Sequence, residues 1–255
     1  SFDDGYLQLM NRRHNAAQAI AAVGLCQSAG FGNISIDLIY GLPGLTTMAW
    51  QKQLEQARQL NVQHLSAYHL SFEEGTAFGL KRRQGKMSEL SEDESIAQFD
   101  ALTNWAVKSG FEHYEISNFA KNGFRSHHNS SYWNGTPYLG IGPAAHSYNH
   151  TTRSWNISNV AKYAAGIAAG GCVSETEVLS PADIFNDYII TALRTADGIN
   201  LDYLECRQPR QMVDNLKRQA ESYLRTGKLQ LAGNRLKLTH DGIFISDEIM
   251  TDLIF

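Results

Sequence analysis

The stretch SHHNSSYWNG, residues 126–135, gathers side chains that can do chemistry within ten positions. Two adjacent histidines, His127 and His128, are followed by Asn129, Tyr132 and Trp133. Imidazole nitrogens can bind a metal, and large aromatic rings beside them can pack against a flat cofactor. The same residue types also fill a core, with the histidine satisfied by hydrogen bonds. In an extended segment the two histidines would point to opposite faces, so we expect at most one of them to serve a single site.

A second candidate is Asp37, a carboxylate inside the apolar run NISIDLIYGLP. Burial of an unpaired carboxylate is costly, so we expect Asp37 to have hydrogen-bonding partners. In parallel β/α folds the carboxyl ends of the strands face the ligand site, where a carboxylate can accept hydrogen bonds from hydroxyls or amines. A structural capping role is the alternative that the spacing leaves open. The turn GLPG that follows is not a phosphate-binding loop, since no Lys-Ser or Lys-Thr comes after it.

Two further patterns predict no site. GIGPAA, from Gly140 to Ala145, fits the dinucleotide-binding pattern by its small residues, but a proline follows Gly142 and the next residues do not predict a helix. His146 and His150 are four residues apart, as zinc ligands on a helix would be. The residues between them argue against a helix, and no partner motif is near. We therefore predict neither a nucleotide site nor a metal site here.

The candidate side chains must be positioned by secondary structure, and the pattern of the first part of the chain predicts an α/β fold. Residues 14–30 and a segment beginning at Thr46 or Thr47 have helical periodicity, and each is followed by an apolar run of strand length. Helices and strands that alternate at this spacing are typical of a parallel sheet. The near-continuous apolar character of the first strand indicates that both its faces are covered. Further along we expect a helix over 92–109, one strand across 110–123, and short strands and loops up to residue 148.

The last part of the chain has a different pattern. Helices are expected over 181–194 and 209–226, the first with Pro181 in its opening turn. KLQLAGNRLKLT then alternates around Gly233 and Asn234, which is a hairpin signal, and Thr239 can cap a final helix. Two helices, a hairpin and a helix predict a winged-helix-like unit. A short helix over 160–171 precedes it, and we place the domains at 1–172 and 173–255.

A winged-helix-like unit raises DNA binding as a class of function. Its basic residues, among them Lys217 and Arg218, are interleaved with acidic residues such as Asp214 and Glu221. The formal net charge of −4 gives no electrostatic reason for nucleic-acid binding either. We therefore expect a packing role for this unit and no nucleic-acid partner.

The amino-acid composition limits the class of protein to which the chain can belong. With 43% apolar and 19% charged residues in a chain of 255, the sequence is typical of a globular protein with a substantial core. It contains no apolar run long enough to span a membrane and no signal-peptide pattern. Its cysteines, Cys26, Cys172 and Cys206, are odd in number and far apart. This favours a reducing, cytoplasmic location and buried cysteines that are neither disulfides nor ligands.

Several segments, in a fixed order along the chain, resemble one known family. They are SFDDGYLQLMNRRH, GFGNISIDLIYGLPGLT, HLSAYHLSFEEGTAF, GFEHYEISNFAKNG, SHHNSSYW and YLGIGPAAHSY. Together they resemble the radical S-adenosylmethionine family of oxygen-independent coproporphyrinogen III oxidase-like proteins. YEISNFAKNG, HNSSYW and GIGPAAHS are similar in particular to the HemW-type heme chaperone branch of that family. The similarity is strong from Ser1 to about Tyr148, and the winged-helix-like unit resembles the family's own C-terminal domain.

The resemblance implies a fold and a set of cofactors. The fold would be α/β, the C-terminal portion of a partial (β/α) barrel followed by a smaller winged-helix-like α+β domain. Family members hold a four-iron, four-sulfur cluster on a Cys-x-x-x-Cys-x-x-Cys loop. This sequence lacks that loop, so we interpret it as a truncated member with no cluster site and no radical chemistry of its own. Arg12 matches the family arginine that pairs with the carboxylate of S-adenosylmethionine, and Asp37 matches the family aspartate at that cofactor.

For the stretch HNSSYW the resemblance implies heme. It matches a His-Asn-x-x-Tyr-Trp motif in which His128 would ligate the iron. Tyr132 and Trp133 would cover the porphyrin face, and Asn129 would orient the ring or bind a propionate. We therefore expect a protein that binds heme and passes it to recipient hemoproteins. The alternative is the oxidative decarboxylation of coproporphyrinogen III, and DNA binding is a distant third.

Overall fold

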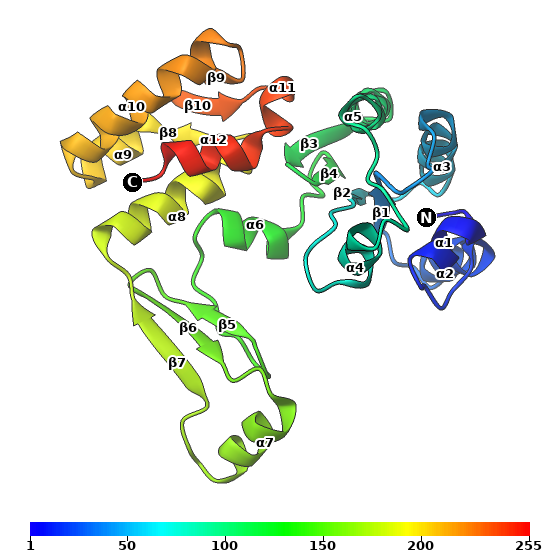
Figure 1. The fold of residues 1–255 in the computed structure, drawn as a ribbon, viewed down its shortest axis with the longest axis horizontal. Helices are drawn as coiled ribbons and strands as arrows, with labels where there is room; N and C mark the ends of the chain where they lie inside the picture. Colours follow the sequence, from blue (N-terminus) through cyan, green and yellow to red (C-terminus); the bar gives the residue numbers. More distant parts are fainter. The chain divides into compact units, whose positions relative to one another are not determined.

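The computed structural model describes every residue from Ser1 to Phe255 and divides into two compact units, Ser1–Ser126 and His127–Phe255. Each unit has its own sheets and its own buried core (Figure 1). The boundary expected after residue 172 falls inside the second unit, and the division into 1–172 and 173–255 stays a prediction. The expected α/β class is confirmed, and none of the sheets closes into a barrel.

The first unit is built on one mixed sheet. Its elements are α1 (Asp4–Leu9), α2 (Ala16–Ser28), β1 (Ser35–Tyr40), α3 (Thr47–Gln59), β2 (His64–His69), α4 (Ala77–Arg83), α5 (Glu92–Lys108), β3 (Phe111–Glu115) and β4 (Asn118–Lys121). The strand order is β1-β2-β4-β3. Strands β1 and β2 are parallel, as expected for β/α units, and Asp37 lies opposite Ser66. Strand β4 pairs antiparallel with both β2 and β3.

The segment 110–123 forms a hairpin, so the expectation of one continuous strand is wrong. The carboxylate of Glu115 closes the turn between β3 and β4. It accepts a hydrogen bond from the backbone N–H of Ser117 at 3.0 Å and another from the side-chain amide of Asn118. A side chain therefore supplies the turn signal that glycine or proline supplies in most hairpins.

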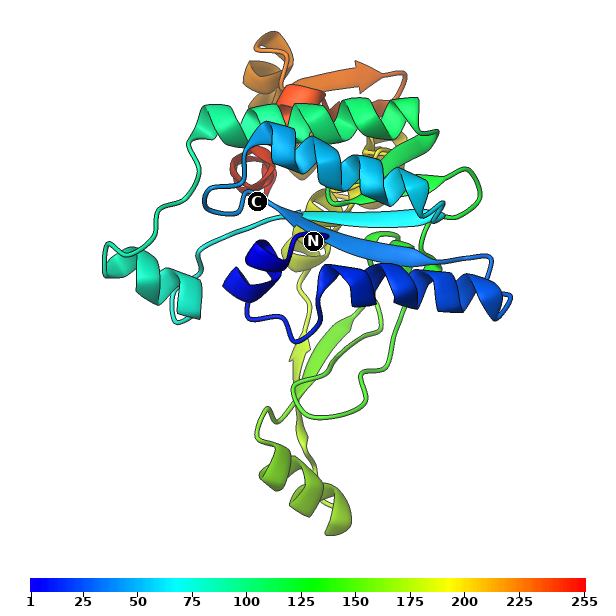
Figure 2. The same cartoon turned by 90° about the vertical axis from the view of Figure 1, so that its right-hand side faces the viewer.

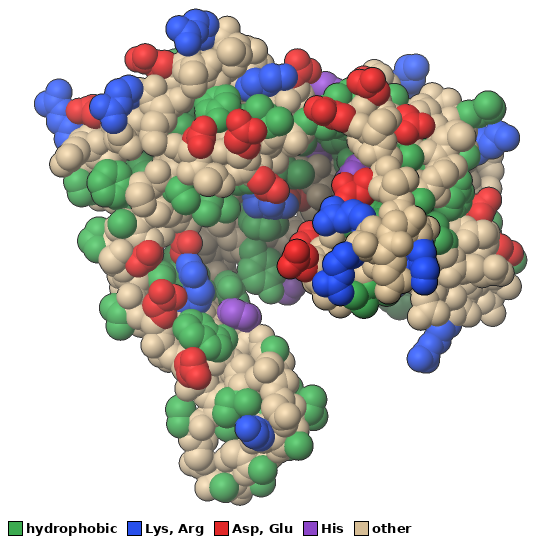
Figure 3. Space-filling view, viewed as in Figure 1, with side chains coloured by type: hydrophobic (Ala, Val, Ile, Leu, Met, Phe, Trp, Pro, Cys, Tyr) green, Lys and Arg blue, Asp and Glu red, His purple; other side chains and the backbone are tan.

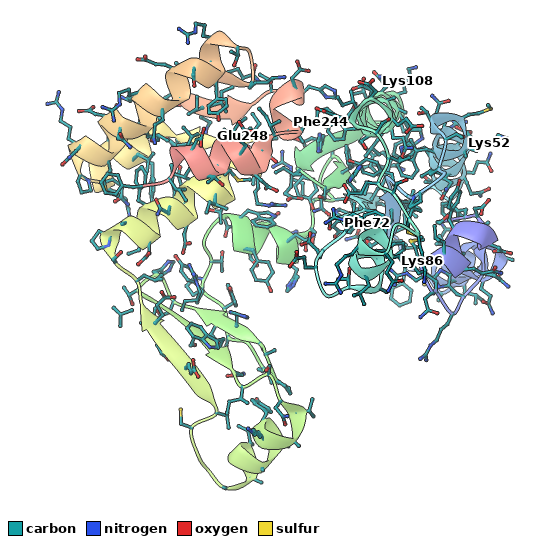
Figure 4. All side chains as sticks on the ribbon, in the orientation of Figure 1. Lys52, Phe72, Lys86, Lys108, Phe244 and Glu248 are labelled. Atoms are coloured by element: carbon teal, nitrogen blue, oxygen red, sulfur yellow. The ribbon has the colours of Figure 1, made fainter.

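Helices α3 and α5 pack side by side on one face of this sheet (Figure 2). Both begin at capped residues, Thr46 and Ser91, whose side chains accept hydrogen bonds from the first turn. Trp50 of α3 is completely buried, stacks on Tyr40 of β1 and donates its indole N–H to the carbonyl of Gln98 in α5. The outer faces of the two helices carry charged side chains such as Lys52 and Lys108 (Figure 4).

The opposite face of β1 is open. Leu38 and Tyr40 are buried toward the helices, whereas Ser35 and Asp37 on the other face are exposed. The expectation that both faces of this strand are covered is therefore wrong for Ser35 and Asp37, because α3 packs on the opposite face, against Tyr40.

The second unit contains two small antiparallel sheets and seven helices (Figure 1). Its elements are α6 (His127–Trp133), β5 (His146–Tyr148), β6 (Thr152–Asn156), α7 (Val160–Ala168), β7 (Ser174–Val178), α8 (Pro181–Leu193), β8 (Ile199–Asn200), α9 (Leu201–Arg207), α10 (Arg210–Arg225), β9 (Leu229–Ala232), β10 (Arg235–Leu238), α11 (His240–Ile243) and α12 (Ser246–Leu253). The sheets have the orders β5-β6-β7 and β8-β10-β9. Pro181 opens α8, and the hairpin β9–β10 turns at Gly233 and Asn234, as predicted.

Three local expectations for the second unit and the cysteines are wrong. The stretch His127–Trp133, expected among strands and loops, is a helix, so its two histidines are not on opposite faces of a strand. Helix α9 was not anticipated. Cys26, Cys172 and Cys206 are all exposed thiols rather than buried side chains. None of the helices combines the length and the apolar character that crossing a bilayer requires.

Candidate functional site

Asp37 lies in the middle of β1 on the open face of the sheet. Its side chain is exposed, so the expectation of a buried carboxylate is wrong. The reason is that Asp37 projects from the face of β1 opposite to the one on which α3 packs. Its charge still acts on a neighbour, because Asp37 is one of two carboxylates that raise the pKa of His64 against the effect of burial.

Arg12 follows α1 in a tight turn. Its backbone N–H donates to the carbonyl of Leu7 at 2.8 Å, and Asn11 before it has a left-handed backbone with φ of +54°. The guanidinium is exposed, and no hydrogen bond or ion pair joins it to Asp37. An exposed guanidinium suits a ligand carboxylate, and an exposed carboxylate suits a ligand amine or hydroxyl. Each side chain is thus accessible to a ligand group of opposite charge, and no contact between the two brings them together.

The turn GLPG at the end of β1 is held by a buried amide. Gln98 of α5, which is fully buried, accepts a hydrogen bond from Gly41 N–H at 3.0 Å and donates to the carbonyl of Leu45 at 2.6 Å. Gly41 has a φ of +72°, and a Cβ atom there would lie 2.5 Å from the ring of His69. Only glycine fits this position, so the sequence of the turn follows from packing.

A largely buried polar cluster, with only Ser35 exposed, was missed by the sequence reasoning. The inner polar cluster consists of Ser35, His64, Tyr114, Glu115 and Asn118 from all four strands. His64 is 4% exposed, and its ring nitrogens contact Ser35 Oγ at 2.7 Å and Tyr114 Oη at 2.8 Å. Burial lowers the pKa of His64, and the charges of Asp37 and Glu115 oppose this. The alternation of polar side chains along β2 was the available signal.

The same cluster fixes the chain just before α6. Tyr114 Oη accepts a hydrogen bond from the backbone N–H of Ser126 at 3.3 Å. The guanidinium of Arg125 lies 5.5 Å from the centre of the Tyr114 ring and pairs with Glu112. Strand β3 therefore holds the last residues of the first unit in place.

Helix α6 arranges the residues of HNSSYW on different faces. His128 and Tyr132 are one helical turn apart, and both are exposed. Their ring centres are 5.1 Å apart in an edge-to-face arrangement. The hydroxyl of Ser131 donates to the carbonyl of His128 at 2.7 Å. The helix thus presents an imidazole and an aromatic ring on one accessible face.

Trp133 lies in a different environment. The guanidinium of Arg194 in α8 lies 4.8 Å from the centre of its ring, at cation–π distance. Its indole N–H is buried and has no acceptor. Asn129 is half-buried. The structure therefore separates the four residues into an exposed pair, His128 and Tyr132, and a more enclosed pair, Asn129 and Trp133.

No cluster-binding cysteine set is present. Cys26 lies in α2, Cys172 precedes β7 and Cys206 lies in α9, so no two of them share the spacing of an iron–sulfur loop. No group of three or more His, Cys, Asp or Glu side chains is placed to hold a metal ion. The cysteines of this chain therefore do not fit a four-iron, four-sulfur cluster. His146 and His150 lie on a hairpin instead of a helix, at the start of β5 and in the turn after it.

Comparison with known proteins defines the class. Residues 179–245 match the model of the HemN C-terminal domain. The chain is 30% identical to the heme chaperone HemW of Mycobacterium tuberculosis over an alignment of 249 residues. This alignment covers 97% of this chain and 62% of the relative. It is 33% identical to the heme chaperone HemW of Lactococcus lactis over an alignment of 205 residues. This second alignment covers 80% of this chain and 54% of the relative.

A solved structure has the same fold over most of the chain. Coproporphyrinogen III oxidase (HemN) from Escherichia coli, described as a radical SAM enzyme, matches with a TM-score of 0.76 over 99% of this chain and 62% of its own, at 18% identity. The chain thus spans about 60% of the length of these relatives. Together the matches confirm the resemblance: the chain is a relative of the radical S-adenosylmethionine, coproporphyrinogen III oxidase-like proteins. Within that group it is related to the HemW heme chaperones.

Proposed function

We propose that this chain binds heme and forms part of a protein that delivers heme to recipient hemoproteins. The observation that carries the proposal is the exposed pair of His128 and Tyr132 on one face of α6. A neutral imidazole is a common axial ligand of heme iron, and an exposed tyrosine ring beside it can pack against the porphyrin. The 30% identity with a protein named heme chaperone supports this choice of ligand.

Asn129 and Trp133 have supporting roles in this proposal. Trp133 anchors α6 through its contact with Arg194, which covers one face of the indole. The other face and the amide of Asn129 are the groups that would meet the porphyrin edge or a propionate. All four residues of the motif then contribute to one heme site, with His128 as the iron ligand.

We further propose that Arg12 and Asp37 hold S-adenosylmethionine, the guanidinium at its carboxylate and the carboxylate of Asp37 at an amine or hydroxyl. When bound beside an iron–sulfur cluster, this cofactor supplies a deoxyadenosyl radical. The open sheet of the first unit would then be the C-terminal portion of a partial (β/α) barrel. Helices α8–α12 with the hairpin β9–β10 would form a winged-helix-like domain.

The two other candidate functions have weaker support. Oxidation of coproporphyrinogen III is the activity named for the Escherichia coli structure, and at 18% identity that likeness shows the fold alone. DNA binding would need a basic surface. Acidic and basic side chains are instead interspersed over α10 (Figure 3), where Lys217 pairs with Glu205 and Arg210 with Asp214.

A hemin titration followed by the Soret band tests the proposal. We expect saturable binding of hemin, weakened about tenfold or more in His128→Ala because the iron loses its ligand. His127→Ala is the matched control, since it removes the neighbouring exposed imidazole from the same helix. Equal binding by wild type and His128→Ala would contradict the proposal.

A further inference from the structure

The rings of the heme motif continue into a longer surface feature of the second unit. The aromatic stripe consists of His128, Tyr132, Tyr138, Tyr148 and His150, in that order in space. The separations between successive ring centres are 5.1, 4.9, 6.2 and 5.6 Å. An exposed imidazole stands at each end, and three tyrosines that are half-buried or exposed lie between them.

The middle of the stripe is rigid. Tyr138 and Tyr148 form an isolated antiparallel bridge, in which each backbone N–H donates to the other's carbonyl at 2.9 Å. Tyr138 then packs edge-to-face on Tyr132, which joins this bridge to α6. Arg153 lies opposite Tyr148 on β6 and pairs with Asp187. The stripe is therefore a fixed platform beside the ion pair of Arg153 and Asp187.

His150 is held outward by the turn that follows β5. Its φ is +73°, a left-handed conformation that costs a non-glycine residue about 1 kcal/mol or more. The side chain of Asn149 fixes this turn, since its Oδ1 accepts hydrogen bonds from the backbone N–H groups of Thr151 and Thr152 at 3.2 and 2.8 Å. Packing of the hairpin accounts for Tyr138 and Tyr148, but it does not require an exposed imidazole at this strained position.

We propose that His150 is a second iron-binding station for heme, joined to the first station at His128 by the three tyrosine rings. The inference deepens the proposed heme site and rests on it. Heme bound at one imidazole moves along the tyrosines to the other. The iron–nitrogen bond at the first imidazole breaks before heme moves, and the bond at the second imidazole forms on arrival. The lone pair of the departing nitrogen stays on its imidazole, and no electron changes hands. Loading and release of heme then occur at different ends of one surface.

The test is a hemin titration of the 255-residue chain and of three variants, His128→Ala, His150→Asn and the double variant. Asparagine tolerates the left-handed backbone, so His150→Asn removes the imidazole without unfolding the turn. His150→Gly is a second replacement that relieves the backbone strain. His14→Ala removes an exposed imidazole from the first unit and serves as the control. Electron paramagnetic resonance of each complex reports the axial ligands of the iron.

Two stations predict that His128→Ala still binds hemin through His150, about tenfold more weakly and with a changed resonance spectrum. His150→Asn should bind within about twofold of wild type, because the stronger station remains. The double variant should lose at least about a hundredfold. His150 variants that bind like wild type, beside a His128→Ala variant that does not bind, would overturn the second station and leave the proposed function intact. Absence of hemin binding by wild type, or equal binding by all variants, would overturn both.

Discussion

The inner polar cluster of the first unit and the aromatic stripe of the second use similar side chains in opposite ways. In the inner polar cluster His64 and Glu115 are 4% and 2% exposed, and both are hydrogen-bonded within the sheet. In the aromatic stripe the two histidines are exposed, and each packs edge-to-face with a tyrosine ring. A buried polar side chain must form its hydrogen bonds with neighbours inside the protein, whereas an exposed imidazole keeps a ring nitrogen available to a ligand.

We therefore expect changes in the two regions to affect different properties, the stability of the fold in one and the affinity for heme in the other. Changes in the inner polar cluster should lower the stability of the first unit, because they leave buried donors or acceptors without partners. Changes at the ends of the aromatic stripe should alter heme affinity at little cost in stability.

The largest effect is expected from Glu115→Ala. The variant leaves the N–H of Ser117 and the amide of Asn118 without their acceptor in a buried turn, and it should destabilise the protein by about 2–3 kcal/mol. Urea denaturation followed by circular dichroism measures this. The control is Glu112→Ala on the same strand, which removes a surface ion pair with Arg125 and should cost less than about 1 kcal/mol. Equal losses in the two variants would contradict the structural role of the cluster.

Tyr132→Ala should show the reverse behaviour. Tyr132 is 38% exposed, so its removal should change stability by less than about 1 kcal/mol. Hemin affinity should nevertheless fall about tenfold, because the porphyrin loses the ring that lies beside His128. Tyr68→Ala is matched in exposure, at 42%, and lies in the first unit. Hemin binding that is weakened equally by both changes would show that Tyr132 has no specific role.

The elements predicted correctly carry local signals. The N-cap of α3 and the opening proline of α8 were visible in the sequence because capping depends on a few adjacent residues. The span of α5 followed from its helical periodicity. The turn of β9–β10 was found in the same way, from Gly233 and Asn234. Strands β1 and β2 followed from their apolar runs.

The elements predicted wrongly lack the usual local signals. The hairpin β3–β4 turns on the side chain of Glu115 and has no glycine or proline at the turn. Helix α6 is seven residues long and rich in residues of low helix propensity, so no local signal predicts it. The residues that could act on a ligand, Asp37 and His128, were identified, but their exposure and the contacts of His64 require the sheet and the second unit to be folded. The roles of Arg12, Asp37 and the four residues of HNSSYW stay predictions.

Replacement of Trp133 tests the enclosed side of the heme motif. Trp133→Phe keeps an aromatic ring under Arg194 and removes an indole N–H that is buried without an acceptor. Stability should therefore change by less than about 0.5 kcal/mol, and hemin affinity should stay within about twofold. Trp133→Ala, which removes the ring, is the contrasting variant and should lower the stability by about 1–2 kcal/mol. Thermal denaturation and the Soret titration measure the two effects, and a large loss of affinity in Trp133→Phe would place the indole N–H on a propionate.

The smallest effect concerns the pH dependence of stability at His64. Burial holds the pKa of His64 below its ordinary value of 6.5, although the carboxylates of Asp37 and Glu115 oppose the shift. The unfolded chain therefore takes up a proton on this side chain at a higher pH than the folded chain does. The contribution of His64 to the stability is complete above pH 6.5 and declines as the pH falls from there toward the lowered pKa.

His64→Gln removes this titration, so the free energy of unfolding should fall less steeply on acidification in the variant than in wild type. Urea denaturation at a series of pH values below neutrality measures the slope, and the slope is informative even where the variant is less stable at every pH. His14→Gln, which removes an exposed histidine of the same unit, should leave the slope unchanged. Identical slopes in wild type and His64→Gln would mean that His64 titrates alike in the folded and unfolded chains. The inner polar cluster would then be as open to solvent as the ends of the aromatic stripe, and the contrast between the two regions would fail.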